Sequence, residues 1–202
     1  MGAILELSKL PSSLILDPPL TDEEFETLCA ANETVRLERT REGKIVVNPP
    51  TGLDSSSSNS EIIYQLRAWW KQHRNGRVFD SNAGFFLPDG SSLSPDAAYA
   101  SADQVRGLTS DDRRHFARFA PAFVVELLSA SDNLRQAREK MESWIANGVE
   151  LGWLVDPYRR NVWVYESGKS PRVEAGSAVA GSGPVQGFVL DLTAVWSEYE
   201  GA

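Results

Sequence analysis

The chain has 202 residues, of which 42% are hydrophobic and 24% are charged. These fractions are ordinary for a folded globular protein, so they exclude a disordered or collagen-like chain, and the length suits one domain with a sizeable core. The net charge of −8 argues against a general binder of polyanions, so any nucleic-acid surface must be local or act through a metal ion.

The single cysteine, Cys29, cannot form an internal disulfide or a cysteine-based zinc site. We therefore expect a reducing, cytoplasmic location. No segment approaches the roughly 18 apolar residues of a membrane span, and no basic region precedes the apolar start of the chain, which argues against a signal peptide. The expected organisation is an N-terminal arm over residues 1–20, a folded domain over 21–197 and a C-terminal tail over 198–202.

Hydrophobic periodicity predicts a chain of helices and short strands. Thr21 and Glu24 have the spacing of a capping box, which marks the start of the first helix. The predicted helices cover residues 22–32, 59–73, 109–116 and 133–147. The predicted strands cover residues 34–39, 44–48, 78–80, 84–87, 97–100, 123–128, 151–155, 162–165 and 188–192.

The order of strand, helix and strand over residues 123–155 predicts a parallel crossover, which is right-handed in nearly all known cases. Hairpins elsewhere add antiparallel pairs to the same sheet. The predicted fold class is therefore α/β or α+β, with a mixed central sheet flanked by helices.

Common catalytic patterns are absent from the sequence: there is no phosphate-binding loop, no glycine-rich dinucleotide motif, no HExxH and no GxSxG. The two histidines, His73 and His115, lie in basic segments that are expected to be exposed, which argues against histidine-based catalysis or metal binding. Carboxylates and lysines remain as the reactive groups.

Glu126 is the most unusual acid, because it lies inside the apolar strand Phe123–Leu128. Burying an ionised carboxylate costs several kcal/mol unless the group is paired, protonated or bound to a metal ion. A structural ion pair, or a position at the open end of the strand, is the alternative interpretation.

Lys140 borders the apolar stripe of the helix that follows this strand. It lies about 10 Å back along the helix at 1.5 Å per residue, which is nearly level with Glu126 at about 7 Å back along its strand plus part of the turn. The spacing predicts that the two side chains can meet. A solvated lysine at the helix flank is the alternative, since Arg138 borders the other side of the stripe.

Asp96 is the second candidate acid, in the sequence Ser94-Pro95-Asp96. Pro-Asp alone is a common turn dipeptide. Followed by a buried glutamate on a neighbouring strand, however, it can contribute to a pair of carboxylates that holds Mg²⁺ or Mn²⁺. A lysine beside such a pair can orient water and stabilise developing negative charge, which suits phosphodiester hydrolysis.

This order of Pro-Asp and then an apolar strand with a glutamate resembles the PD-(D/E)XK nuclease superfamily. The chain most closely resembles the Uma-two family, a restriction-endonuclease family that is expanded in cyanobacteria, and the resemblance extends over residues 21–197. The segments that carry it are Arg36–Arg39, Gly43–Pro50, Phe79–Phe85, Leu93–Ala97, Phe123–Ser131, Glu139–Met141, Gly152–Pro157 and Pro184–Trp196.

The resemblance implies a restriction-endonuclease-like core. We expect a Mg²⁺- or Mn²⁺-dependent DNA endonuclease, and a homodimer, because two sites most simply cut two strands. The resemblance also implies that Asp96 and Glu126 are metal ligands, that Lys140 is catalytic and that Glu38 completes the acid set. In one respect the chain departs from the superfamily: the lysine expected two residues after the second acid is Leu128 here. Considered from its local sequence, Glu38 is a charged residue on the polar face of a hairpin.

Two basic segments, residues 67–77 and 113–118, could contact DNA or could simply solvate a helix face. The main alternative function is a catalytically silent nuclease-fold module that binds DNA or protein. A further alternative is a structural dimer formed through Trp69, Trp70 and Trp153, although core packing is the expected role of these side chains.

Overall fold

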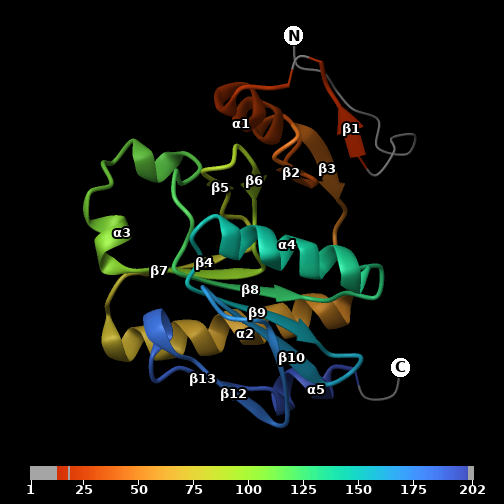
Figure 1. The fold of residues 1–202 in the computed structure, drawn as a ribbon, viewed down its shortest axis with the longest axis vertical. Helices are drawn as coiled ribbons and strands as arrows, with labels where there is room; N and C mark the ends of the chain where they lie inside the picture. The colour runs from red at the N-terminus through yellow and green to blue at the C-terminus, as the bar shows by residue number, and fades with distance from the viewer. Residues whose placement is uncertain (1–12, 18, 200–202) are drawn as a thin grey trace. The chain divides into compact units, whose positions relative to one another are not determined.

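The computed structural model describes residues 13–17 and 19–199, and it divides the chain into two compact units (Figure 1). Unit 1 comprises residues 1–50, 82–94 and 109–119, and unit 2 comprises residues 51–81, 95–108 and 120–202. Residues 1–12 and 18 of the expected N-terminal arm, and 200–202 of the expected tail, lie outside the described residues.

Unit 1 is built on a five-stranded sheet of order β1-β3-β2-β6-β5. The apolar side of helix α1 (Asp22–Ala30) contributes Phe25, which packs with Leu37, Ile45 and Phe86 in a small core. The strands are β1 (Ser13–Ile15), β2 (Arg36–Arg39), β3 (Lys44–Asn48), β5 (Phe85–Phe86) and β6 (Ser92–Leu93).

Unit 2 is built on a six-stranded mixed sheet of order β11-β10-β9-β8-β7-β4. Strands β8 and β9 are parallel, and the other neighbouring strands are antiparallel. The strands are β4 (Arg77–Asp80), β7 (Ala97–Ala100), β8 (Phe123–Leu127), β9 (Leu151–Asp156), β10 (Asn161–Glu166) and β11 (Arg172–Ala175). The expected fold class, a mixed central sheet flanked by helices, is thereby confirmed.

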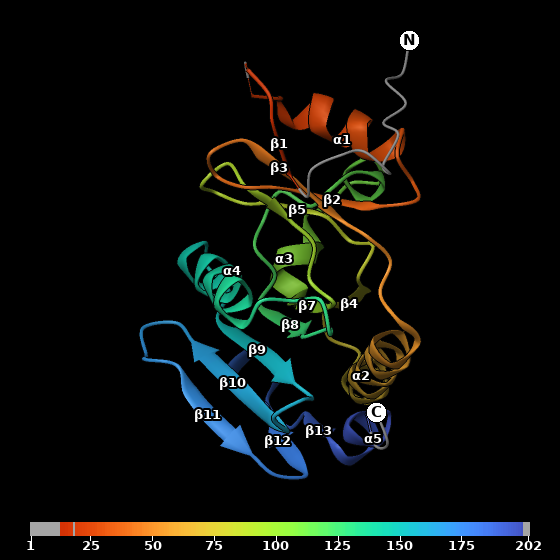
Figure 2. The ribbon, with the colours of Figure 1, turned by 90° about the vertical axis from the view of Figure 1, so that its right-hand side faces the viewer.

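Helices cover both faces of this sheet (Figure 2). Helix α4 (Leu134–Ala146) connects β8 to β9 and lies on one face, which forms the expected parallel crossover. Helix α2 (Leu53–His73) lies on the other face, with α5 (Thr193–Ser197) and the ribbon of β12 (Ala178–Ala180) and β13 (Val189–Asp191). The short helices α3 (Ala102–Arg106) and η3 (Gly183–Val185) complete unit 2.

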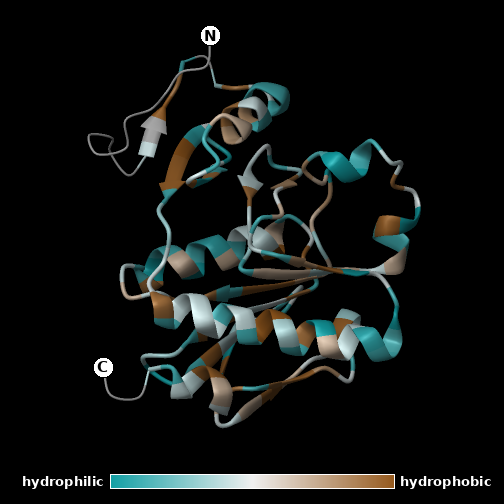
Figure 3. Ribbon diagram, turned by 180° about the vertical axis from the view of Figure 1, so that it is seen from behind, coloured by the Kyte–Doolittle hydropathy of each residue, from teal (hydrophilic) through white to brown (hydrophobic). Residues whose placement is uncertain are grey.

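The main core of unit 2 lies between the sheet and α2. Ile62 and Leu66 of α2 pack against alternate residues of β8, namely Phe123, Val125 and Leu127. The central strands β7, β8 and β9 are largely hydrophobic, whereas the helices alternate hydrophilic and hydrophobic segments (Figure 3). This pattern is typical of amphipathic helices on a sheet that is covered on both faces.

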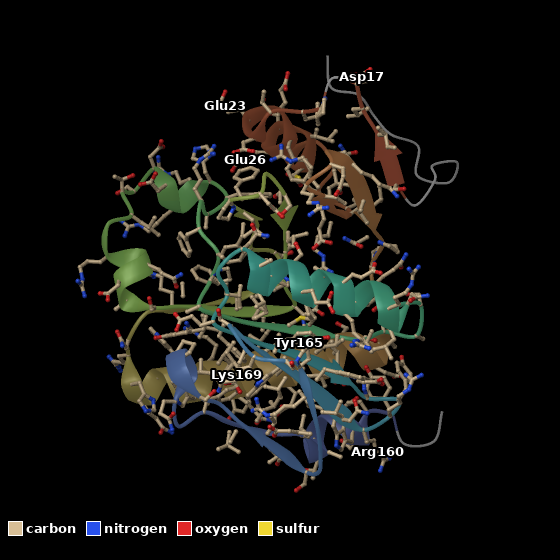
Figure 4. The ribbon with its side chains drawn as sticks, in the orientation of Figure 1. Asp17, Glu23, Glu26, Arg160, Tyr165 and Lys169 are labelled. Atoms are coloured by element: carbon tan, nitrogen blue, oxygen red, sulfur yellow. The ribbon has the colours of Figure 1, made fainter. Side chains whose placement is uncertain are left out.

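The predicted helix over 109–116 is wrong: only a single 3₁₀ turn, η2 (Asp112–Arg114), forms there. Asp112 instead closes a local turn by accepting hydrogen bonds from the amide and hydroxyl of Thr109. The amide of Phe116 then donates at 2.8 Å to Glu26 on α1 (Figure 4), a contact that replaces a helical hydrogen bond.

The predicted helix over 59–73 begins earlier, at Leu53, so the serine run is helical. Ser55 and Ser58 are buried, and they accept from Tyr199 and donate to the Val195 carbonyl, respectively. Six further elements lack a sequence signal strong enough to predict them, and all are short or exposed: β1, β6, β11, β12, α3 and α5. Over residues 13–17 and 19–199, no helix is long and apolar enough to cross a membrane.

An ion pair with a buried arginine contributes to the stability of unit 1. Arg39, 4% exposed, donates to the carboxylate of Asp22, which also accepts from Arg118. Partial burial would raise the pKa of Asp22, but the hydrogen bonds from Arg39 and Arg118 lower it below its ordinary value of 3.8. The stabilisation is therefore present above pH 3.8 and is lost as the pH falls through the lower pKa of the folded state.

We expect Asp22→Asn to lower the free energy of unfolding at pH 7 by about 1–2 kcal/mol, because a buried guanidinium loses its charged partner. The difference from the wild type should shrink below about pH 4 as the wild-type carboxylate protonates. Urea unfolding at both pH values measures this. Glu42→Gln is the control, since its partner Arg41 is exposed, and a wild-type-like midpoint for Asp22→Asn would contradict the prediction.

Candidate active site

Strand β8 carries Glu126 into the interior of unit 2. Its neighbours Val125 and Leu127 face the core below α2, so the alternation of the strand turns Glu126 toward α4. Only 7% of Glu126 is exposed. A carboxylate in this position requires polar partners from the helix above it.

Helix α4 supplies these partners from two positions one turn apart, which lie on the same face of a helix. The ammonium Nζ of Lys140 lies 2.9 Å from Glu126 Oε1, and the indole Nε1 of Trp144 donates to the same oxygen at 2.8 Å. The side chain of Lys140 is 20% exposed, whereas Trp144 is fully buried. The spacing in the sequence predicts that Lys140 and Glu126 lie level and can meet, and the structure has this contact.

Asp96 lies immediately before β7, which pairs with β8 so that Ala97 faces Val125. The Asp96 amide donates to the Val125 carbonyl at 3.0 Å, and its carboxylate Oδ2 accepts from the Leu127 amide at 2.8 Å. Peptide geometry then puts Asp96 Oδ2 within about 5 Å of the Glu126 Cα. Asp96 therefore lies beside the backbone of Glu126 near the C-terminal end of β8, and Lys140 contacts the side chain of Glu126.

Glu38 belongs to β2 of unit 1, where it is 6% exposed. Its Oε1 accepts from the Ser94 amide at 2.9 Å, and its Oε2 accepts from the Asn48 side chain at 3.2 Å. Glu38 therefore fixes the backbone at Ser94, which Pro95 and Asp96 follow in the chain.

Leu128, at the position where the superfamily has its lysine, is 4% exposed and its amide bonds to the Val155 carbonyl. No ammonium group is available from this strand position. The cation beside the glutamate comes instead from α4, through Lys140.

The hydrogen bond from the Trp144 indole to Glu126 was not predicted from the sequence. The spacing of Trp144 places it on the apolar stripe of the helix, and that pattern predicts a core residue. The available signal was its position four residues after Lys140, on the same helix face.

The donor set suits a hard divalent cation. Mg²⁺ is commonly held by one or two carboxylates, with water and substrate phosphate oxygens completing the shell, and Asp96 and Glu126 are carboxylates from neighbouring strands. Within residues 13–17 and 19–199, no group of three or more His, Cys, Asp or Glu side chains could hold a metal ion. A site with Asp96 and Glu126 as its protein ligands would leave the remaining positions to water and substrate oxygens.

The tryptophans proposed for a structural dimer are largely interior. Trp153 is fully buried and stacks on Phe188, and Trp69 is 9% exposed. The indole of Trp70 donates to the Gly76 carbonyl at 2.9 Å and its ring packs under Arg67. These contacts favour core packing over a dimer surface.

The two basic segments, residues 67–77 and 113–118, differ in how their charged side chains are exposed and paired. In the first, Lys71, Arg74 and Arg77 are exposed. In the second, Arg118 pairs with Asp22 and His115 contacts Glu26.

Comparisons with known proteins place the chain among nuclease-related sequences and folds. The model of the Uma2 family, described as "Putative restriction endonuclease", matches residues 22–193, which fall within the range of the resemblance found in the sequence. A solved structure of a "putative nuclease belonging to DUF820" from Anabaena variabilis ATCC 29413 is similar, with a TM-score of 0.74 and 22% identity, over 89% of this chain and 99% of that chain. At this identity the likeness concerns the fold. No curated protein matches the chain.

The pair of Lys140 and Glu126 should be energetically coupled. Lys140→Met leaves a buried carboxylate without its cation and should lower the free energy of unfolding by about 1–3 kcal/mol. Glu126→Gln removes the charge that needs the lysine. The free energy of unfolding lost by the double variant should therefore be about 1–3 kcal/mol smaller than the sum of the losses of the two single variants. Urea unfolding of the four proteins gives the coupling, and additivity within about 0.5 kcal/mol would contradict it.

Proposed function

Since the chain belongs to the Uma2 family, we propose that it is a metal-dependent endonuclease that hydrolyses phosphodiester bonds of DNA. Two contacts near the C-terminal end of β8 support the proposal: Asp96 Oδ2 accepts from the Leu127 amide, next to Glu126, and Lys140 pairs with the Glu126 carboxylate. Two oxygen donors and an ammonium group are the set that this hydrolysis needs.

In this proposal Asp96 and Glu126 hold Mg²⁺ or Mn²⁺. The bound cation would polarise the scissile phosphate and lower the pKa of a water ligand. Lys140 would orient the attacking water and stabilise the negative charge that develops on the phosphate. Its stem comes from a helix, and its partly exposed ammonium can reach toward solvent while it remains beside Glu126.

Glu38 is proposed as the third acid of the set. Its support is twofold: the family resemblance assigns an early glutamate, and the Glu38 carboxylate holds the Ser94 amide two residues before Asp96 in the chain. Glu38→Gln would retain the size of the side chain and is expected to reduce cleavage.

The remaining parts of the proposal concern partners and location. The exposed Lys71, Arg74 and Arg77 are proposed to contact the DNA backbone. A homodimer is proposed because two sites most simply cut two strands, and a solution mass equal to one chain would contradict it. The single cysteine, Cys29, supports a reducing, cytoplasmic location.

We expect Asp96→Asn, Glu126→Gln and Lys140→Met each to reduce Mg²⁺-dependent nicking of plasmid DNA by at least about 100-fold, because each removes either a proposed metal ligand or the ammonium group that orients the attacking water. Circular dichroism should show a retained fold. The matched controls are Asp103→Asn on α3 and Lys169→Met in the turn after β10 (Figure 4), both exposed. Full activity in all three variants would overturn the mechanism.

Metal binding separates this function from a catalytically silent module. The wild type should gain thermal stability with Mn²⁺, by about 2.7 kcal/mol at 100 times the dissociation constant. Asp96→Asn should lose most of this gain because one of two carboxylate ligands becomes neutral. A flat wild-type response, together with retained DNA binding, would instead support the silent module.

A further inference from the structure

Trp144 differs from the other tryptophans in what its indole N–H binds. Over the described part of the chain, the indoles of Trp70 and Trp196 donate to backbone carbonyls, whereas those of Trp69, Trp153 and Trp163 have no hydrogen-bond partner. The indole of Trp144 donates to a carboxylate, that of Glu126, at 2.8 Å. Core packing alone does not require this bond, since Trp153 is equally buried without one.

We propose that Trp144 is a positioning residue that holds the Glu126 carboxylate in the orientation needed to bind a divalent cation. This inference rests on the proposed function and concerns how the glutamate is kept in place. Ligating carboxylates are themselves commonly held by hydrogen bonds, and loss of such a bond typically costs about 10- to 100-fold in metal affinity or activity.

The two donors to Glu126 Oε1 have different physical properties. Lys140 has a long, flexible side chain that is 20% exposed, and its charge attracts a phosphate as well as a carboxylate. Trp144 is rigid, neutral and fully buried, and its N–H does not titrate near neutral pH. When Lys140 turns toward water or phosphate, the indole N–H still restrains the carboxylate.

The geometry also shows which oxygen of the Glu126 carboxylate is restrained. Both contacts converge on Oε1, so two groups from one helix restrain the position of this oxygen. Because Trp144 is one turn after Lys140, a single rigid element sets both the ligand orientation and the position of the ammonium group.

The test compares Trp144→Phe with Trp153→Phe in the full chain. Both substitutions remove an indole from a fully buried position, but only the first removes a hydrogen bond to Glu126. Trp153 lies on β9 beside Val125, in the core below α2 rather than below α4. Calorimetric titration with Mn²⁺ in the absence of DNA measures affinity independently of activity.

We expect about 10- to 100-fold weaker Mn²⁺ binding for Trp144→Phe and a change below about threefold for Trp153→Phe. The Mn²⁺ concentration for half-maximal nicking should rise in parallel, and the maximal rate should recover at saturating Mn²⁺. If Trp144 had only a structural role, Trp144→Phe would lower the fraction of active protein without changing the Mn²⁺ concentration for half-maximal nicking. If Trp144→Phe does not fold, the benzothiophene analogue of tryptophan at position 144 removes only the N–H.

The outcomes separate the two proposals. If the wild type binds Mn²⁺ and nicks DNA, and Glu126→Gln does neither, equal Mn²⁺ affinity of Trp144→Phe and the wild type overturns the positioning role alone. If the wild type neither binds Mn²⁺ nor nicks DNA, the endonuclease function and the positioning role both fail.

Discussion

A carboxylate removed from water destabilises the folded chain unless other groups replace its hydration, and Glu126 is the side chain to which this constraint applies most strongly. The strand around it is apolar on the α2 side, so its partners must come from the opposite face. Lys140 and Trp144 meet this requirement with two contacts to one oxygen. Their need to reach Glu126 restricts how α4 can rotate and slide over the sheet.

The same constraint explains how much of the site could be predicted from the sequence. The apolar strand around Glu126, the following helix and the parallel crossover predicted that Lys140 lies level with the acid, because rise per residue is fixed in both elements. Asp96 was a weaker candidate, since Pro-Asp is frequent in turns. Glu38 was identified through family resemblance and not from its local sequence. The role of Trp144 was not predictable, because apolar spacing does not reveal the partner of an indole N–H.

Contacts between residues distant along the chain contribute to two of the errors in the predicted helices. The serines at the start of α2 carry no apolar signal, and their burial depends on Val195 and Tyr199 near the other end of the chain. The segment before Phe116 has local helix signals, but Glu26 takes the Phe116 amide. Elements whose periodicity is strong and local, such as β8 and α4, were predicted within a few residues.

The apolar residue at position 128 has a consequence for recognising similar chains. Leu128 bonds through its backbone to β9 and its side chain is buried, so this position supplies no charged group. A motif search that demands a lysine two residues after the glutamate would pass over this sequence. A pattern that also accepts a lysine on the next helix, about fourteen residues downstream as here, would retain it.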